Sequence, residues 1–246
     1  MTRAAAALAL LLLPAVGHAG GDEVTLRYDH TPGVRLVYEF TAKTVSGKSG
    51  DLIETTIRAT VEYEILSDSD PKSGRSLVRC RIESLEVEEL APVLRPAVPD
   101  LKALPCEGKL GPDTMTAAVV VPKGSTGPVR GLATAVNVFI GVSAYGWARL
   151  PEHAVRLGDR WGPGVDGHGD GSRLVYTFSR LDRGEAAIEL LDDRDTAKKH
   201  VHDEGRYTFD TAAGRWLSTS ATTAVEDSKT GWGVHTKIEA HLVSAR

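Results

Sequence analysis

The chain has 246 residues, of which 25% are charged and 41% are hydrophobic, and its formal net charge is −4 at pH 7. This ordinary globular composition excludes a disordered, collagen-like or coiled-coil chain. Lysine and arginine form no basic run, which argues against nucleic-acid binding because phosphate neutralisation needs concentrated positive charge. The sequence also indicates no cofactor, since it lacks a P-loop, a dinucleotide fingerprint and an H-E-x-x-H motif.

The N-terminal residues predict an export signal. Arg3 is the only charge within residues 1–19, and an apolar run over 4–16 follows it. Gly17 and Ala19 supply the small residues of a cleavage site, so we expect a signal peptide at 1–19. The apolar run is shorter than the roughly 20 residues of a membrane span, although an uncleaved anchor is the alternative. No later segment is long and apolar enough for a span, and we expect a periplasmic or extracellular mature chain.

Export changes the interpretation of the two cysteines, Cys80 and Cys106. An oxidising compartment and an even count predict a disulfide between them, around a proline-rich loop. Two separate buried thiols are the alternative.

Alternating apolar and polar residues predict strands through the first half. Val24, Leu26 and Tyr28 alternate, 34–40 alternates after a turn, and the clearest alternation runs over 53–65. In the next strand, the apolar positions change phase near Ser84, which indicates a β-bulge. Four prolines predict an irregular loop over 92–105, and a further strand is expected over 114–121.

A nearly uncharged segment divides the two halves. Apolar residues at 3–4 spacing predict one buried helix over 132–145, although its Val and Ile content also permits two short strands. Asp192, Asp193 and Asp195 flank Arg194 and are expected in a solvated turn. Strands are expected at 172–181, 186–191, 198–203, 206–210, 215–226 and 232–244.

A short internal sequence repeat suggests two related halves. Residues 35–38 and 173–176 share the sequence Arg-Leu-Val-Tyr, and Phe40 and Phe178 follow at the same offset. We therefore expect one β-rich domain over 20–246, with related halves at about 24–128 and 152–246 joined by 129–151. Chance is the alternative, because strands draw on a small alphabet. The expected fold is mainly β, an antiparallel two-half sandwich or partly closed barrel with one inserted helix.

One stretch resembles a known group of proteins. Pro151 precedes Val-Arg-Leu-Gly-Asp-Arg-Trp at 155–161, and Tyr-Thr-Phe-Asp at 207–210 precedes Gly-Arg-Trp at 214–216. This order resembles exported bacterial proteins of uncharacterised function, many of them lipoproteins, over residues 108–246. The resemblance implies a β-rich protein of the cell envelope and transfers no catalytic residue. The lipoproteins' anchoring cysteine has no counterpart after the expected cleavage site.

Two groups of side chains are candidate sites. His200 and His202 flank Val201 on an expected strand, so both imidazoles would share one face and could bind a metal ion; a solvated strand face is the alternative. The candidate contacts for an apolar ligand are Phe139, Tyr145, Trp147 and Trp161, with core packing as the alternative for the tryptophans.

The absence of a catalytic motif favours a non-catalytic envelope protein that binds an apolar small molecule or another envelope component. The alternatives are a structural or protein-interaction module and a metal-dependent hydrolase that uses His200 and His202.

Overall fold

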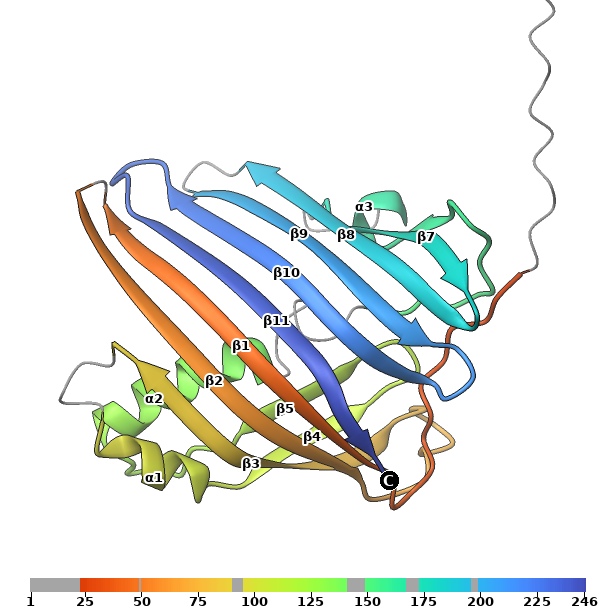
Figure 1. Cartoon of the computed structure of the whole chain (residues 1–246), viewed down its shortest axis with the longest axis horizontal. Helices are drawn as coiled ribbons and strands as arrows, with labels where there is room; N and C mark the ends of the chain where they lie inside the picture. The colour runs from red at the N-terminus through yellow and green to blue at the C-terminus, as the bar shows by residue number, and fades with distance from the viewer. Residues whose placement is uncertain (1–22, 49, 90–94, 141–148, 167–172, 196–198) are drawn as a thin grey trace, which may run out of the picture.

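The computed structural model describes residues 23–48, 50–89, 95–140, 149–166, 173–195 and 199–246. Within these residues the strands form one antiparallel sheet of 11 strands, in the order β5-β4-β3-β2-β1-β11-β10-β9-β8-β7-β6 (Figure 1). The first and last long strands, β1 (Arg35–Lys48) and β11 (Gly233–Ala245), pair in the middle of the sheet. The sheet therefore consists of two consecutive meanders that meet at β1 and β11.

The N-terminal meander continues from β1 with β2 (Asp51–Ile65), β3 (Ser76–Glu88), β4 (Cys106–Leu110) and β5 (Met115–Val119). The C-terminal meander contains the short β6 (Arg160–Trp161), β7 (Val175–Asp182), β8 (Glu185–Asp195), β9 (Lys199–Asp210) and β10 (Arg215–Asp227), followed by β11. The helices are α1 (Ala97–Lys102), α2 (Gly127–Ile140) and the single turn α3 (Pro163–Asp166).

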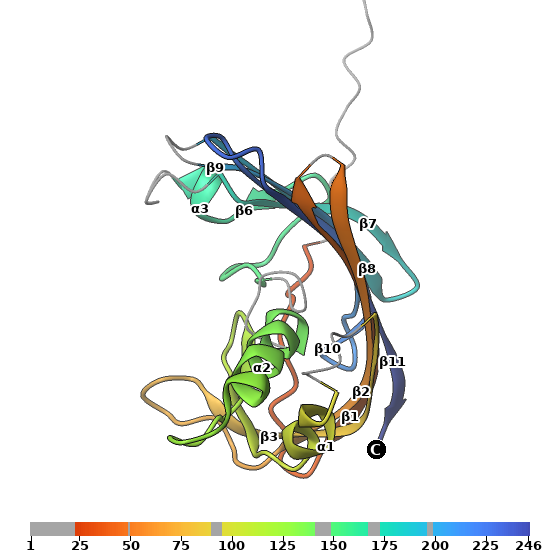
Figure 2. The same cartoon turned by 90° about the vertical axis from the view of Figure 1, so that its left-hand side faces the viewer.

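The sheet is strongly curved, and its concave side holds the core. Figure 2 shows α1, α2 and the segment that precedes β1 on this concave side. The inward side chains of β2 are buried at every second position, from Ile57 to Ile65, as the sequence alternation predicted. A register shift between β2 and β3, where Thr60 pairs with Ser84 and Val61 with Ile82, confirms the predicted bulge.

The extended segment before β1 crosses the concave side and is part of the core. Leu26 and Tyr28 are buried, and Trp216 donates its indole N–H to the Tyr28 hydroxyl. Gly214 makes this approach possible, because a Cβ there would lie 2.6 Å from the Asp29 backbone nitrogen. The alternation at 24–28 thus gives a packed extended segment, whose strand-like pairing in the described residues is a single bridge between Val24 and Val155.

The expected fold class is confirmed as an antiparallel, β-rich fold with a helix inserted between its halves. The expected geometries were a two-half sandwich and a partly closed barrel. The described strands form a single curved sheet that does not close, which corresponds to the second. The predicted helix at 132–145 corresponds to α2, and its residues 141–145 lie outside the described residues. The expected halves and the signal peptide stay predictions; residues 1–22 also lie outside the described residues.

The structure differs from the sequence-based expectation at several places. The segment 92–105 is not entirely irregular, because α1 starts directly after Pro96 and a proline in the first turn of a helix loses no hydrogen bond. The strand β4, which follows this segment, was not anticipated. The strands expected at 198–203 and 206–210 form the single strand β9. Gly205 lies within this strand and pairs with Ala221 of β10.

The two edge strands of the sheet are protected from further strand pairing in different ways. β6 has only two residues, so little backbone is exposed at that edge. At the other edge, the Asn137 side chain on α2 accepts a hydrogen bond from the Val119 backbone N–H at 2.7 Å and donates one to the Val119 carbonyl at 3.4 Å. The amide of Asn137 thus replaces a neighbouring strand at β5.

Candidate functional site

The predicted Cys80–Cys106 disulfide is present in the structure. Cys80 on β3 and Cys106 on β4 occupy directly paired positions in the strand register, and their Cα atoms are 4.8 Å apart. Both cysteines are buried. The bond ties the end of the chain segment that contains α1 to the long strand β3.

Trp161 is the one predicted ligand contact whose side chain the described residues include. It is buried, its ring stacks on Tyr176 with a centroid distance of 5.8 Å, and its indole N–H donates to the Arg149 carbonyl at 2.7 Å. Burial also raises the pKa of Tyr176 to about 12. Trp161 lines a hollow of about 750 Å³, which it shares with both apolar and charged residues, among them Leu150 and Glu152. The role of Trp161 in binding therefore stays a prediction.

The other three predicted contacts cannot be placed at a site. Phe139 lies in α2, but its side chain is outside the described part of the structure. Tyr145 and Trp147 belong to residues 141–148, which are outside it altogether.

His200 and His202 lie on β9 and share the face of the sheet that points away from the core. The His200 Nε2 atom is 3.9 Å from an Asp193 carboxylate oxygen. Across the residues that the structure describes, no group of three or more His, Cys, Asp or Glu side chains could hold a metal ion. The structure thus supplies no third ligand to these histidines there, and we do not propose a metal centre.

A row of polar side chains crosses the concave face, and the sequence did not reveal it. Six inward positions pair from strand to strand along β8, β9, β10, β11, β1 and β2. They are Asp192, Asp203, Thr223, Thr236, Thr44 and Thr55. The expectation of a solvated turn at Asp192 was wrong, because this residue lies inside β8 and is only 1% exposed. Burial raises the pKa of its carboxyl, an effect that Arg194 opposes and Asp203 increases.

The strongest candidate site lies on the opposite side of the sheet, at its N-terminal end. A groove of about 870 Å³ is lined by β3, β4, β5 and the segment 102–105 that leads from α1 into β4. We call it the β3–β5 groove. Three exposed large apolar side chains line it: Leu77, Val120 and Leu66, with exposed fractions of 54%, 45% and 41%.

The backbone beneath the β3–β5 groove is held rigidly. Cys80 and Cys106 line the groove, so the disulfide joins its two sides. Gly108 also lines it, and a Cβ at this position would lie 2.1 Å from the Thr116 carbonyl oxygen. Only glycine therefore permits the close approach of β4 and β5 that shapes the groove.

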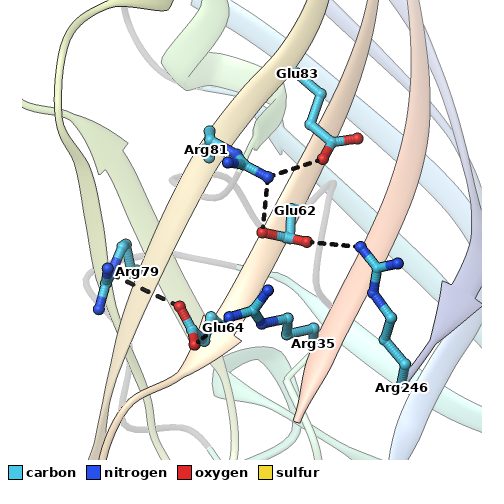
Figure 3. A network of polar contacts seen from close by, with 7 residues as sticks. All are labelled: Arg35, Glu62, Glu64, Arg79, Arg81, Glu83 and Arg246. Atoms are coloured by element: carbon cyan, nitrogen blue, oxygen red, sulfur yellow. Dashed lines mark hydrogen bonds and ion pairs between the residues drawn. The ribbon is translucent and has the colours of Figure 1, made fainter. Parts of the chain in front are cut away.

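An ion-pair network borders the groove on the outer face of β2 and β3 (Figure 3). Glu62 has a side chain only 7% exposed, and its two oxygens contact Arg81 at 3.2 Å and Arg246 at 3.3 Å. Arg79 is 3.8 Å from Glu64. Arg79 and Arg81 both line the groove. Their charges are therefore already paired with glutamates of the network.

The groove also has basic residues outside this network. Lys102 ends α1, and Lys109 lies on β4 opposite Leu77 in the strand register. Both lysines are exposed, and neither has an ion-pair partner in the part of the chain that the structure describes. Apolar and cationic side chains thus occur together in the β3–β5 groove.

Sequence reasoning missed this site although it located the disulfide. Leu77 sits at an outward position of an alternating strand, and one exposed leucine requires no explanation. No local apolar pattern marked the site, because the outward neighbours of Cys80 are Arg79 and Arg81 and Glu107 follows Cys106. The convergence of the apolar side chains depends on β4 and β5, and β4 was not predicted.

Comparisons with known proteins identify no family for this chain. No family model matches the sequence, and no curated protein matches it. The resemblance to exported envelope proteins therefore stays an expectation, while the β-rich architecture that it implied is present. Among the described residues, no helix combines the length and the apolar character that a membrane crossing requires.

Several solved structures resemble the backbone remotely. Lipovitellin, studied for its lipid–protein interactions, aligns with 89% of this chain at 9% identity and a TM-score of 0.49, and this chain covers 26% of its length. DynF from the dynemicin biosynthesis pathway of Micromonospora chersina aligns with 96% of this chain at 9% identity and a TM-score of 0.23; 92% of DynF is covered. An outer-membrane lipoprotein-sorting protein domain from Vibrio parahaemolyticus aligns with 85% at 10% identity and a TM-score of 0.19; 84% of that domain is covered. None of these likenesses is close enough to assign a function.

Proposed function

We propose that this protein is exported and that it binds an apolar ligand, a lipid with an acyl chain, in the β3–β5 groove without catalysing a reaction. The observation that carries this proposal is the convergence of Leu66, Leu77 and Val120 on one groove of about 870 Å³. Single exposed apolar side chains are normal on protein surfaces, whereas a hollow lined by several of them marks a binding surface. Ligand pockets commonly measure about 300–1,000 Å³, so the groove has a suitable size.

The disulfide supports both parts of the proposal. A stable disulfide requires an oxidising compartment, which agrees with the export signal expected at residues 1–19. It also joins β3 and β4 beneath the groove, so the apolar side chains are held in place before a ligand binds. A preorganised site loses less conformational entropy on binding.

Leu77→Asp tests the site directly. Leu77 is exposed, so this substitution should leave the fold intact and place a charge in the apolar groove. We expect binding of a fluorescent dodecanoate to weaken about tenfold or more, because an acyl chain loses an apolar contact and must desolvate a carboxylate. Titration followed by fluorescence measures the Kd.

Leu181→Asp is the matched control, because Leu181 is 43% exposed on β7, far from the groove in the strand order. Equal losses in the two variants, or no binding by the wild-type protein, would contradict the proposal. Native mass spectrometry of protein from the producing cell adds an independent readout: we expect a bound lipid. A single crosslinked protein partner without any lipid would favour an interaction module instead.

A further inference from the structure

We infer that the β3–β5 groove selects amphiphiles with an anionic head group, which Lys102 and Lys109 bind; this inference rests on the proposed function. The charges around the groove motivate it. The groove and its ion-pair network contain six basic and four acidic side chains, on a chain whose net charge is −4. The basic residues are Arg35, Arg79, Arg81, Arg246, Lys102 and Lys109, and the acidic ones are Glu62, Glu64, Glu83 and Glu107. A positive region on an acidic protein indicates a negatively charged ligand.

The arginines and the lysines have different roles in this arrangement. Arg81 contacts both Glu62 and Glu83 at 3.2 Å, so its charge is matched within the protein. Arg79 is weakly matched by Glu64 at 3.8 Å. The two lysines have no such partner in the described part of the chain, and their ammonium groups are available to an anion.

The acidic side chain inside the groove does not cancel this preference. Among the described residues that line the groove, Glu107 is the one carboxylate. In the β3–β4 register it lies directly opposite Arg79, on the same outer face. Lys109 lies one outward position further along β4, opposite Leu77, so a cation stands next to the apolar surface. An acyl chain on Leu77 would thus bring a carboxylate or phosphate head group to Lys109.

The relative strengths of the two interactions determine the expected result. Each methylene group of an acyl chain that is buried contributes about 0.8 kcal/mol, so the chain supplies most of the affinity. An exposed ion pair is far weaker and depends on salt. The lysines are therefore expected to provide selectivity between head groups more than binding strength.

The experiment compares three ligands of equal chain length: dodecanoate, dodecyl phosphate and neutral 1-dodecanol. We expect the wild-type protein at low salt to bind at least one anion about three- to tenfold more tightly than the alcohol, and the better anion identifies the head group. Lys102→Gln/Lys109→Gln should remove this difference and leave dodecanol binding unchanged. Raising the salt concentration should reduce the same difference in the wild-type protein.

Lys43→Gln/Lys229→Gln is the matched control, since both lysines are exposed outside the groove and the net charge changes equally. A preference for anions that survives in Lys102→Gln/Lys109→Gln would overturn the inference, as would an equal loss in the control. If dodecanol and both anions bind equally well, the inference fails and the proposed function stands. If none of the three binds, both fail. Displacement of dodecanoate by millimolar inorganic phosphate would show a plain anion site and would also overturn the inference.

Discussion

The two meanders of the sheet differ in what lies on them, although each is built from consecutive antiparallel strands. The C-terminal meander, from β6 to β11, consists mostly of long strands that pair regularly. The N-terminal meander shortens at β4 and β5, and it carries the disulfide and the two helices α1 and α2. Both halves have the same antiparallel strand pattern, but the β3–β5 groove lies on the N-terminal one. The short strands β4 and β5, together with β3 and the segment 102–105, line the groove.

Removing the disulfide from the N-terminal meander is expected to lower the free energy of unfolding more than any of the single substitutions that follow. Cys80→Ala/Cys106→Ala opens a link between residues separated by 26 positions, and it should lower the free energy of unfolding by about 3–4 kcal/mol. Urea denaturation of the variant, and of wild-type protein under reducing conditions, measures the loss. We also expect weaker ligand binding, because β3 and β4 are no longer joined. A loss below about 1 kcal/mol would show that the N-terminal meander is held by packing alone.

The edge strand β5 comes next in expected magnitude. Asn137→Ala removes both hydrogen bonds to the Val119 backbone and should cost about 1–3 kcal/mol, because a backbone group is left without a partner. Thr134→Ala, one turn earlier on the exposed side of α2, is the control and should change stability little. Equal effects of the two substitutions in thermal unfolding would mean that the side-chain amide does not protect the edge.

The smallest expected effect lies in the C-terminal meander. Burial raises the pKa of Asp192, so the folded protein binds this proton more tightly than the unfolded chain does. The stability that protonation contributes is present at low pH and is lost as the pH rises through the folded-state pKa. We therefore expect Asp192→Asn to be more stable than the wild-type protein at about pH 7 and equally stable at about pH 3.

Asp193→Asn serves as the control for that measurement, since Asp193 is the exposed neighbour on the same strand. Urea unfolding at both pH values compares the variants. A stabilisation of Asp192→Asn that does not depend on pH would contradict the assigned cause.

The repeated Arg-Leu-Val-Tyr sequence occupies similar positions in the two meanders. Tyr38 and Tyr176 are both buried, as are Phe40 and Phe178, and each pair member lies on the first long strand of its meander. Equivalent positions in two consecutive meanders agree with related halves. The origin of the halves by duplication stays a hypothesis.

The amino-acid sequence by itself determined the local features of this protein. Alternation over 53–65 predicted the buried face of β2, the phase change near Ser84 predicted a bulge, and the two cysteines predicted their bond. These features depend on residues that are close in the chain or, for the disulfide, on there being only two cysteines. The tertiary structure alone decided the polar row on the concave face and the β3–β5 groove. The polar row depends on the pairing of β1 with β11, two strands that are distant in sequence and whose register no local pattern specifies. The groove depends on the pairing of β4 with β3 and β5, and β4 has no apolar alternation that would have revealed it.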